Sequence, residues 1–290
     1  MKKTLSFSLI LLLSISFLAQ DYWQQQISYK MHIDFDHVNH QFSGIQEITY
    51  YNNSPENLDK LFMHLYYNAF QPGSMMDVRS RTIEDPDSRV EDRIAKLSKN
   101  EIGFQKIESI NNSKGEKLSF NEDGTILGII LNKPLKSGKS IKLKVNFNAQ
   151  VPVQIRRTGR YNKENVAYSM TQWYPKMCEY DKHGWHTNPY IGREFYGVWG
   201  DFEVNIAIDS SFVLGGTGVV QNPQEVGHGY QDPNKKLKLN SSKKLVWEFK
   251  AENVHDFAWA ADPDFLHETT KLENGTILHF LHKDDSLNDN

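Results

Sequence analysis

The chain has 290 residues, enough for one large or two ordinary domains with a sizeable buried core. Its formal net charge of -3 excludes the strongly basic surface that is typical of nucleic-acid-binding proteins. The single cysteine, Cys178, excludes a disulfide within the chain, so stability must come from the core.

The first twenty residues predict a secretory signal peptide. Met1-Lys2-Lys3 supplies the positive start, and the apolar run from Leu5 to Leu18 is too short to span a membrane. Cleavage is expected near Ala19 or Gln20, and no cysteine follows that could carry a lipid anchor. We therefore expect residues 1–20 to be removed and the mature protein to be exported, to the periplasm or the outside, without a membrane span.

Residues 21–282 are predicted to form one all-β domain, a β-sandwich or saddle. Short apolar or alternating runs recur along the chain, with turn signals such as Glu122-Asp123-Gly124 and Asn274-Gly275 between them. Strands are expected at 27–36, 42–51, 61–66, 103–110, 126–131, 140–149, 201–209, 213–220, 244–251, 256–261 and 276–281.

The stretch from Asp77 to Asn100 breaks this pattern. It holds twelve charged residues of both signs and few apolar ones. We expect a solvated excursion whose charges pair with one another, with a helical turn or two around Val90 to Leu97. A ligand-binding role for its arginines is the alternative.

The stretch from Tyr168 to Val204 carries the densest chemical signal. Nine aromatic side chains fall between Trp173 and Phe202. Such a cluster is either the core of a sheet, where aromatic residues are favoured, or a binding surface. Both interpretations remain open from composition alone.

An ordered series of segments resembles the N-terminal domain of the aminopeptidase N family, the gluzincin zinc metallopeptidases, over about residues 22–282. The segments are Tyr29 to Asp36 with Phe42-Ser43-Gly44, Leu61 to Leu65, Trp173-Tyr174-Pro175, Tyr180 to Trp185, Phe195 to Val204 and Val254 to Ala260. The resemblance implies a β-sandwich or saddle-like N-terminal domain of an aminopeptidase N-type enzyme. It also implies that part of the aromatic cluster faces a catalytic domain.

The family's catalytic motifs, His-Glu-x-x-His and Gly-x-Met-Glu-Asn, do not occur in this chain. Its one His-Glu dipeptide is His267-Glu268, and Lys271 stands where the second zinc histidine is required. Residues 267–275 fit a strand, a turn and a strand better than a helix. The resemblance thus implies zinc for the complete enzyme, but no zinc ligand and no catalytic residue in this chain.

Gln172 is the one candidate for substrate binding. In the resembled family, a Gln or Glu a few residues before an aromatic-Pro turn helps to hold the free α-amino group of the substrate. Gln172 lies three residues before Pro175, with fewer residues between than is common in the family. An amide oxygen can accept hydrogen bonds from an ammonium group. The alternative is that Gln172 braces the turn.

Two other sites are weaker candidates. Cys178 has His183 and His186 near it in sequence, but the neighbouring acidic residues disfavour a reactive thiolate. A zinc site formed by His183, His186 and Asp181 is the other, although loop histidines more often serve packing or hydrogen bonding.

The polar connector 283–290 follows the last strand, so the chain is expected to be truncated before the catalytic domain, either as a fragment or by natural loss. The predicted function is that of a non-catalytic N-terminal portion of an exported zinc aminopeptidase-like protein, which contributes a wall of the peptide-binding cleft. Its partner would then be a peptide substrate, met through the missing catalytic domain. The alternative is a free-standing secreted β-sandwich that binds peptide or glycan.

Overall fold

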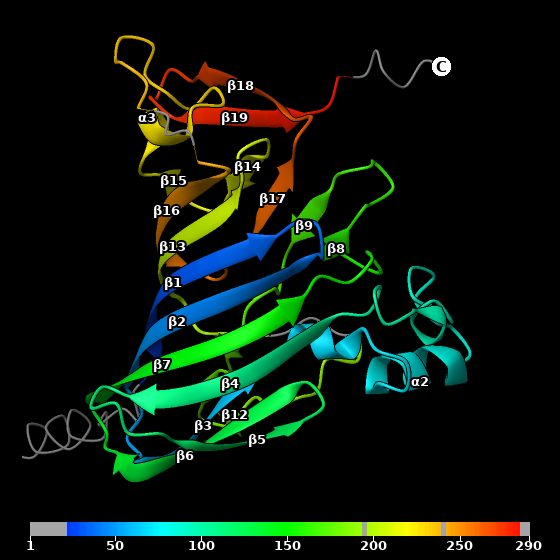
Figure 1. Ribbon diagram of the computed structural model, residues 1–290. Coiled ribbons are helices and arrows are strands. Elements are labelled where there is room, and N and C mark those ends of the chain that lie inside the picture. Colours follow the sequence, from blue (N-terminus) through cyan, green and yellow to red (C-terminus); the bar gives the residue numbers. More distant parts are fainter. Residues whose placement is uncertain (1–21, 193–195, 239–241, 285–290) are drawn as a thin grey trace, which may run out of the picture.

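The computed structural model describes residues 22–192, 196–238 and 242–284. The predicted signal peptide, residues 1–20, and most of the connector 283–290 lie outside the described residues. A curved seven-stranded sheet forms one side of the molecule, and smaller sheets lie behind it (Figure 1). The prediction of an all-β fold is confirmed.

Strands make up most of the secondary structure, with a few short helices between them. In chain order the elements are β1 (Gln26–Asp36), β2 (Gln41–Asn52), β3 (Leu58–His64), η1 (Tyr66–Ala69), α2 (Met75–Thr82), η2 (Ile94–Lys96), β4 (Phe104–Asn112), β5 (Ser119–Asp123), β6 (Ile126–Leu135), β7 (Lys139–Gln150), β8 (Gly159–Arg160), β9 (Tyr168–Met170), β10 (Lys176–Met177), β11 (Tyr180–Asp181), β12 (Gly184–Trp185), β13 (Gly200–Asp209), β14 (Val213–Gly216), β15 (Val219–Val220), α3 (Pro223–Val226), β16 (Lys244–Val254), β17 (Trp259–Asp262), β18 (Leu266–Lys271) and β19 (Ile277–His282).

The large sheet has the order β15-β16-β13-β1-β2-β7-β4. Neighbouring strands are antiparallel except for β1 and β13, which run parallel at its centre. Strict alternation in β1 buries every second side chain, because successive side chains of a strand point to opposite faces. Gly44 in β2 leaves space for the Phe147 ring of β7, since a Cβ there would lie 2.4 Å from two ring atoms.

The core lies between the buried face of this sheet and two four-stranded sheets, β10-β3-β6-β5 and β14-β17-β9-β8. Phe35 of β1, for example, meets the rings of Tyr168 in β9 and Trp259 in β17 edge to face, with centroid distances of 4.7 and 5.6 Å. Such aromatic pairs add to the free energy gained from apolar burial. These contacts fix the second layer against the large sheet, and the segments that carried the family resemblance are divided between the two.

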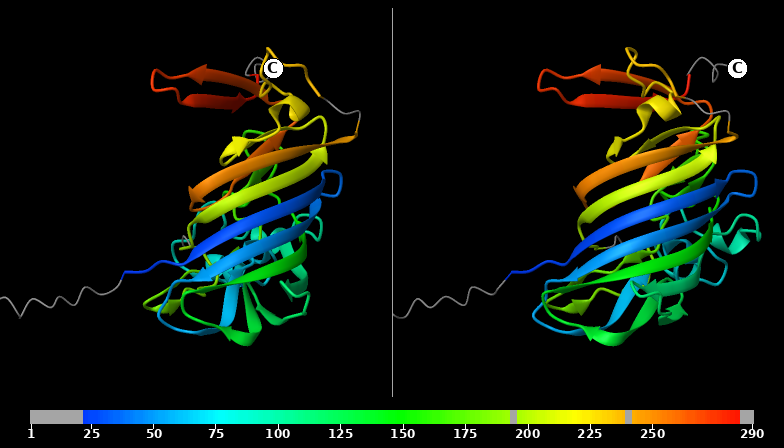
Figure 2. Two further views of the ribbon diagram at one scale, coloured as in Figure 1. Left: turned by 90° about the vertical axis from the view of Figure 1, so that its left-hand side faces the viewer. Right: turned by 60° about the vertical axis from the view of Figure 1, so that its left-hand side comes forward.

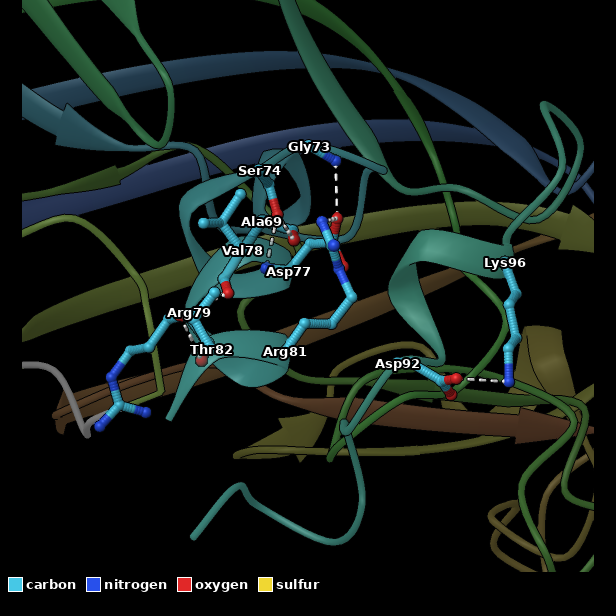
Figure 3. Close-up of polar contacts among 10 residues, drawn as sticks. All are labelled: Ala69, Gly73, Ser74, Asp77, Val78, Arg79, Arg81, Thr82, Asp92 and Lys96. Carbon is cyan, nitrogen blue, oxygen red and sulfur yellow. Dashed lines mark hydrogen bonds and ion pairs between the residues drawn. The ribbon is translucent and has the colours of Figure 1, made fainter. Parts of the chain in front are cut away.

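The charged excursion between β3 and β4 contains a helix that the sequence pattern did not predict. Helix α2 begins after Ser74, whose Oγ accepts a hydrogen bond from the Asp77 amide at 3.1 Å. Asp77 in turn accepts from the Gly73 amide and pairs with Arg81 at 2.9 Å (Figure 3). Mutual charge pairing is thus confirmed, as it also is at Lys96, which lies 2.6 Å from Asp92. Asp77 itself is buried rather than solvated.

The hairpin β18-β19 lies at one end of the molecule (Figure 2), where His267 and His279 pack against the Tyr230 ring. It confirms the predicted strand, turn and strand around Asn274-Gly275. Its strands pair only with each other among the described residues, and most of their side chains are exposed on both faces. Within the part of the chain that the structure describes, no helix is long and apolar enough to cross a membrane.

Candidate functional site

Two of the segments that gave the family resemblance, residues 173–175 and 254–260, are joined by side-chain hydrogen bonds. The Trp173 indole donates to the Phe257 carbonyl at 3.0 Å, and the Tyr174 hydroxyl donates to Asp256 Oδ1 at 2.7 Å. The Lys176 ammonium donates to the His255 carbonyl at 2.8 Å. These bonds join residues 173–176 to residues 255–257, about eighty positions further along the chain.

Lys176 is a buried cation, with a side chain only 1% exposed. Its Nζ lies 3.4 Å from Asp256 Oδ1, so the carboxylate offsets part of the charge. Burial nevertheless lowers the pKa of Lys176. Because a buried ion pair becomes strongly unfavourable when one partner is removed, Asp256 holds this corner of the fold together.

The aromatic cluster is mainly core. Trp173, Tyr174 and Phe202 are fully buried, and the Tyr29 ring of β1 stacks on Phe202 at 4.8 Å. Of the described members, only Tyr196 and Trp199 expose close to half of their surface, so a broad aromatic binding surface does not form among them. Of the two open interpretations, a core role is therefore confirmed for most of the described members, because they fill the space between the layers.

Gln172 lies in the bend between β9 and β10 and is 3% exposed. Its backbone has a φ of 56°, a left-handed conformation that residues other than glycine seldom adopt. The Oε1 atom of Gln172 and the Oγ1 atom of neighbouring Thr171 are buried, and neither has a hydrogen-bond partner among the described residues. Buried polar atoms are nearly always paired, so the amide oxygen of Gln172 is an acceptor with unused capacity.

Cys178 cannot act as a nucleophile in this setting. Its side chain is fully buried, and burial raises the pKa of the thiol far above its usual range. The neighbouring Glu179 is also buried, and burial raises the pKa of its carboxyl to about 7. Burial, with the charge of Lys176 as a second cause, lowers the pKa of His64 to about 4.

The loop zinc site does not assemble. His186 Nε2 lies 2.9 Å from Asp181 Oδ2, but His183 contributes only its backbone amide, which donates to Asp181 Oδ1. No three His, Cys, Asp or Glu side chains of the described ranges lie grouped so that they could hold a metal ion. His267 faces His279 instead of a metal partner, with 2.9 Å between the two ring nitrogens.

Two features of this region could not be predicted from the sequence. The burial of Lys176 had no signal, since lysine is among the residues least often buried. The burial of Glu179 likewise depends on packing between segments that are distant in sequence. Gln172 was named as a candidate from the family resemblance around the Trp-Tyr-Pro turn, and its role stays a prediction.

The chain matches no protein-family model and no curated protein by sequence. In structure it is similar to a two-domain M1 zinc metallopeptidase bound to L-tryptophan, with a TM-score of 0.50 and 11% identity over 89% of this chain. A second similar structure is the M1 zinc metallopeptidase from Deinococcus radiodurans bound to a Tyr-Ser-Ala substrate, with a TM-score of 0.49 and 12% identity over 88% of this chain.

The chain spans 47% of the first of these structures and 46% of the second. The fold is therefore that of the N-terminal domain of an M1 metallopeptidase. The resemblance found in the sequence is confirmed at the level of the fold.

Proposed function

We propose that this chain is the non-catalytic N-terminal portion of an exported zinc aminopeptidase-like protein, and that it contributes a wall of the peptide-binding cleft. The shared fold supports this proposal, because the matched M1 structure contains a second half of comparable length. In that arrangement the zinc ion, its ligands and the general base belong to the other domain. The described residues of this chain do not fit a zinc ion, since no suitable group of ligands comes together.

The observation that carries the proposal is the state of Gln172. A buried amide oxygen without a donor, in a left-handed backbone, is the kind of strained and unsatisfied position that functional sites retain. The α-ammonium group of a peptide would supply the missing donor. Because Gln172 is only 3% exposed, this role requires the surrounding chain to move aside when the amine enters.

The test uses two ligands that differ only at the amine, leucinamide and N-acetyl-leucinamide, added to the mature chain and followed by amide NMR shifts. Leucinamide is expected to shift resonances around Gln172, whereas the acetylated form, which has no ammonium, is not. Gln172→Asn shortens the side chain and so withdraws the amide, while asparagine tolerates the left-handed backbone. This variant should bind leucinamide at least about threefold more weakly. Gln172→Glu should bind at least as well, because a charged acceptor strengthens the bond.

Gln41→Ala, on the exposed edge of β2, serves as the control and should leave binding unchanged. Equal shifts with both ligands, or equal affinity in the Gln172→Asn variant, would remove Gln172 from the proposed function. The chain alone is not expected to hydrolyse aminoacyl anilides. Turnover that a chelator abolishes would show that this chain holds catalytic chemistry of its own.

A further inference from the structure

A small cavity of about 190 Å³ lies beside the hairpin β11-β12. The residues that line it include Glu179, Asp181, Lys182, Trp23 and Tyr196. Pockets for drug-sized ligands measure roughly 300–1,000 Å³, so this one has room for a single small group. We refer to it as the Glu179 pocket.

Glu179 is the unusual member of this pocket. It is only 5% exposed, yet its carboxylate makes one hydrogen bond, in which Oε1 accepts from the Tyr180 amide at 3.2 Å. A carboxylate has about four acceptor sites, so most of its capacity is unused. No Lys, Arg or His nitrogen of the described residues lies within ion-pair distance of it.

The nearest bases are already occupied. Lys176 donates to the His255 carbonyl and lies beside Asp256, and His186 lies against Asp181. A carboxylate that is buried without a cationic partner is unfavourable, because burial removes the water that stabilises its charge. A cation bound in the pocket would therefore stabilise the ionised form of Glu179.

The walls of the pocket suit the same kind of group. The Trp23 ring stacks on Tyr180 at 5.8 Å, and the Tyr196 ring packs edge to face with His186 at 4.8 Å, so both rings are held in place. Aromatic faces attract cations, and most strongly when the cation is partly removed from water. Carboxylates next to aromatic rings form the environment in which proteins bind organic ammonium groups.

We propose that the Glu179 pocket binds an alkylammonium group, with Glu179 as the anionic partner, Asp181 as the second charge and Trp23 and Tyr196 as aromatic walls. The group comes either from a free amine or from the lysine side chain of a peptide. This site is separate from the proposed role of Gln172, and neither depends on the other.

The main test titrates choline into the mature chain and follows Trp fluorescence and amide NMR shifts, with 3,3-dimethyl-1-butanol as the neutral isostere. Choline is expected to bind and the isostere is not. Glu179→Gln should lower the affinity for choline at least tenfold, while Glu203→Gln, on the exposed face of the large sheet, should not change it. Equal binding of both probes, or full affinity in Glu179→Gln, would overturn the proposal.

If the Glu179→Gln variant does not fold, a pH series on the wild-type chain tests the same proposal. Since burial raises the pKa of Glu179 to about 7, its carboxylate fraction increases roughly tenfold between pH 6 and pH 8, and choline affinity should rise with it. The other titratable groups facing Glu179 are Asp181, His186, Lys176, Tyr50 and Tyr196. Burial raises the pKa of both tyrosines, so they stay neutral between pH 6 and pH 8. Burial acts to raise the pKa of Asp181, but hydrogen bonds from His183 and His186 outweigh it and keep that pKa low, so Asp181 is already ionised in this range. An affinity that is flat from pH 6 to pH 8 would contradict the proposal.

Lys182 borders the pocket and is the chain's own competing cation. It forms no ion pair among the described residues, so it is available to enter the pocket when no ligand is present. Lys182→Gln should therefore keep or raise the affinity for choline, and loss of binding in this variant would overturn the proposal. A Gly-Lys-Gly peptide that competes with choline would identify a lysine side chain as an occupant, whereas choline binding without competition would restrict the site to free amines.

Discussion

At the scale of single residues, the second layer contains two buried groups whose titrations change the free energy of unfolding in opposite directions as the pH falls. His64 has a pKa of about 4, below that of free histidine at about 6.5. Between these two pH values, His64 is protonated in the unfolded chain and neutral in the folded chain. This contribution to stability falls as the pH drops, by roughly 2 kcal/mol between pH 7 and pH 5. Glu179, with its pKa raised to about 7, acts in the opposite direction, because there the folded chain keeps a proton that the unfolded chain releases.

Burial also lowers the pKa values of His40, His255 and His279, and these histidines act alike in the wild type and in the variants. Compared with the wild type, His64→Leu should therefore gain stability between pH 7 and pH 5, because it lacks the His64 contribution that is lost over this range. Glu179→Gln should become less stable at pH 5 for the converse reason. Urea unfolding at both pH values measures the change within each variant, which removes differences in their overall stability. Parallel pH profiles for all three proteins would contradict this account.

These residues also mark how much of the site the sequence could predict. Gln172 could be proposed because a local series of residues resembles a family, and that resemblance is confirmed for the fold alone. The burial of Lys176, Glu179 and His64 could not be predicted. Each depends on contacts between segments that are distant along the chain, and polar residues carry no local sign of such contacts.

At the scale of elements, strand prediction succeeded wherever apolar alternation was long, as in β1, β2 and β7. It missed β8 to β12, which have two or three residues each and exist only because a partner strand pairs with them. Helix α2 was also missed, although Ser74 followed by Asp77 three residues later is a capping pattern. The many charged residues that follow predicted a solvated excursion instead of a helix.

The N-cap of α2 provides a direct test of this element. Ser74→Ala removes the hydroxyl that accepts the Asp77 amide and donates to the Ala69 carbonyl at 2.6 Å. The free energy of unfolding should fall by about 1 kcal/mol. Ser74→Asp restores an acceptor and should recover most of the loss. Thermal and urea unfolding of the three proteins measure both changes, and an unaffected Ser74→Ala variant would show that α2 contributes nothing to global stability.

At the scale of the whole molecule, the exposed apolar surface lies on the hairpin β18-β19 rather than on the aromatic cluster. Ile277 is 54% exposed and Phe280 50%, and Leu266 and Leu278 are also exposed. A two-stranded hairpin is marginally stable in isolation, and contiguous exposed apolar residues favour association. Within the proposed function, a second domain would cover this hairpin.

The mature chain should therefore bind a hydrophobic dye while folded and self-associate at high concentration. Replacing both Leu278 and Phe280 by Ser should reduce both effects without lowering the melting temperature, because these side chains are already exposed. Val38→Ser, in the exposed turn between β1 and β2, is the control and should change neither dye binding nor self-association. Sedimentation and dye fluorescence make the comparison, and a monodisperse, dye-negative wild type would argue against an uncovered interface.

The parallel pairing of β1 with β13 sets the order in which this molecule can fold. Strands β1, β2, β7 and β4 come from the first half of the chain, and β13, β15 and β16 from the second, so each group can pair within itself. Within the large sheet the two groups join along the β1-β13 pairing, from Ile27 opposite Gly200 to Asp34 opposite Ala207. Closing so long a loop loses chain entropy before any contact is gained. During synthesis, β1 therefore waits with one edge open until most of the chain has been made. If the chain is exported as proposed, it would have to remain unfolded until β13 has been made.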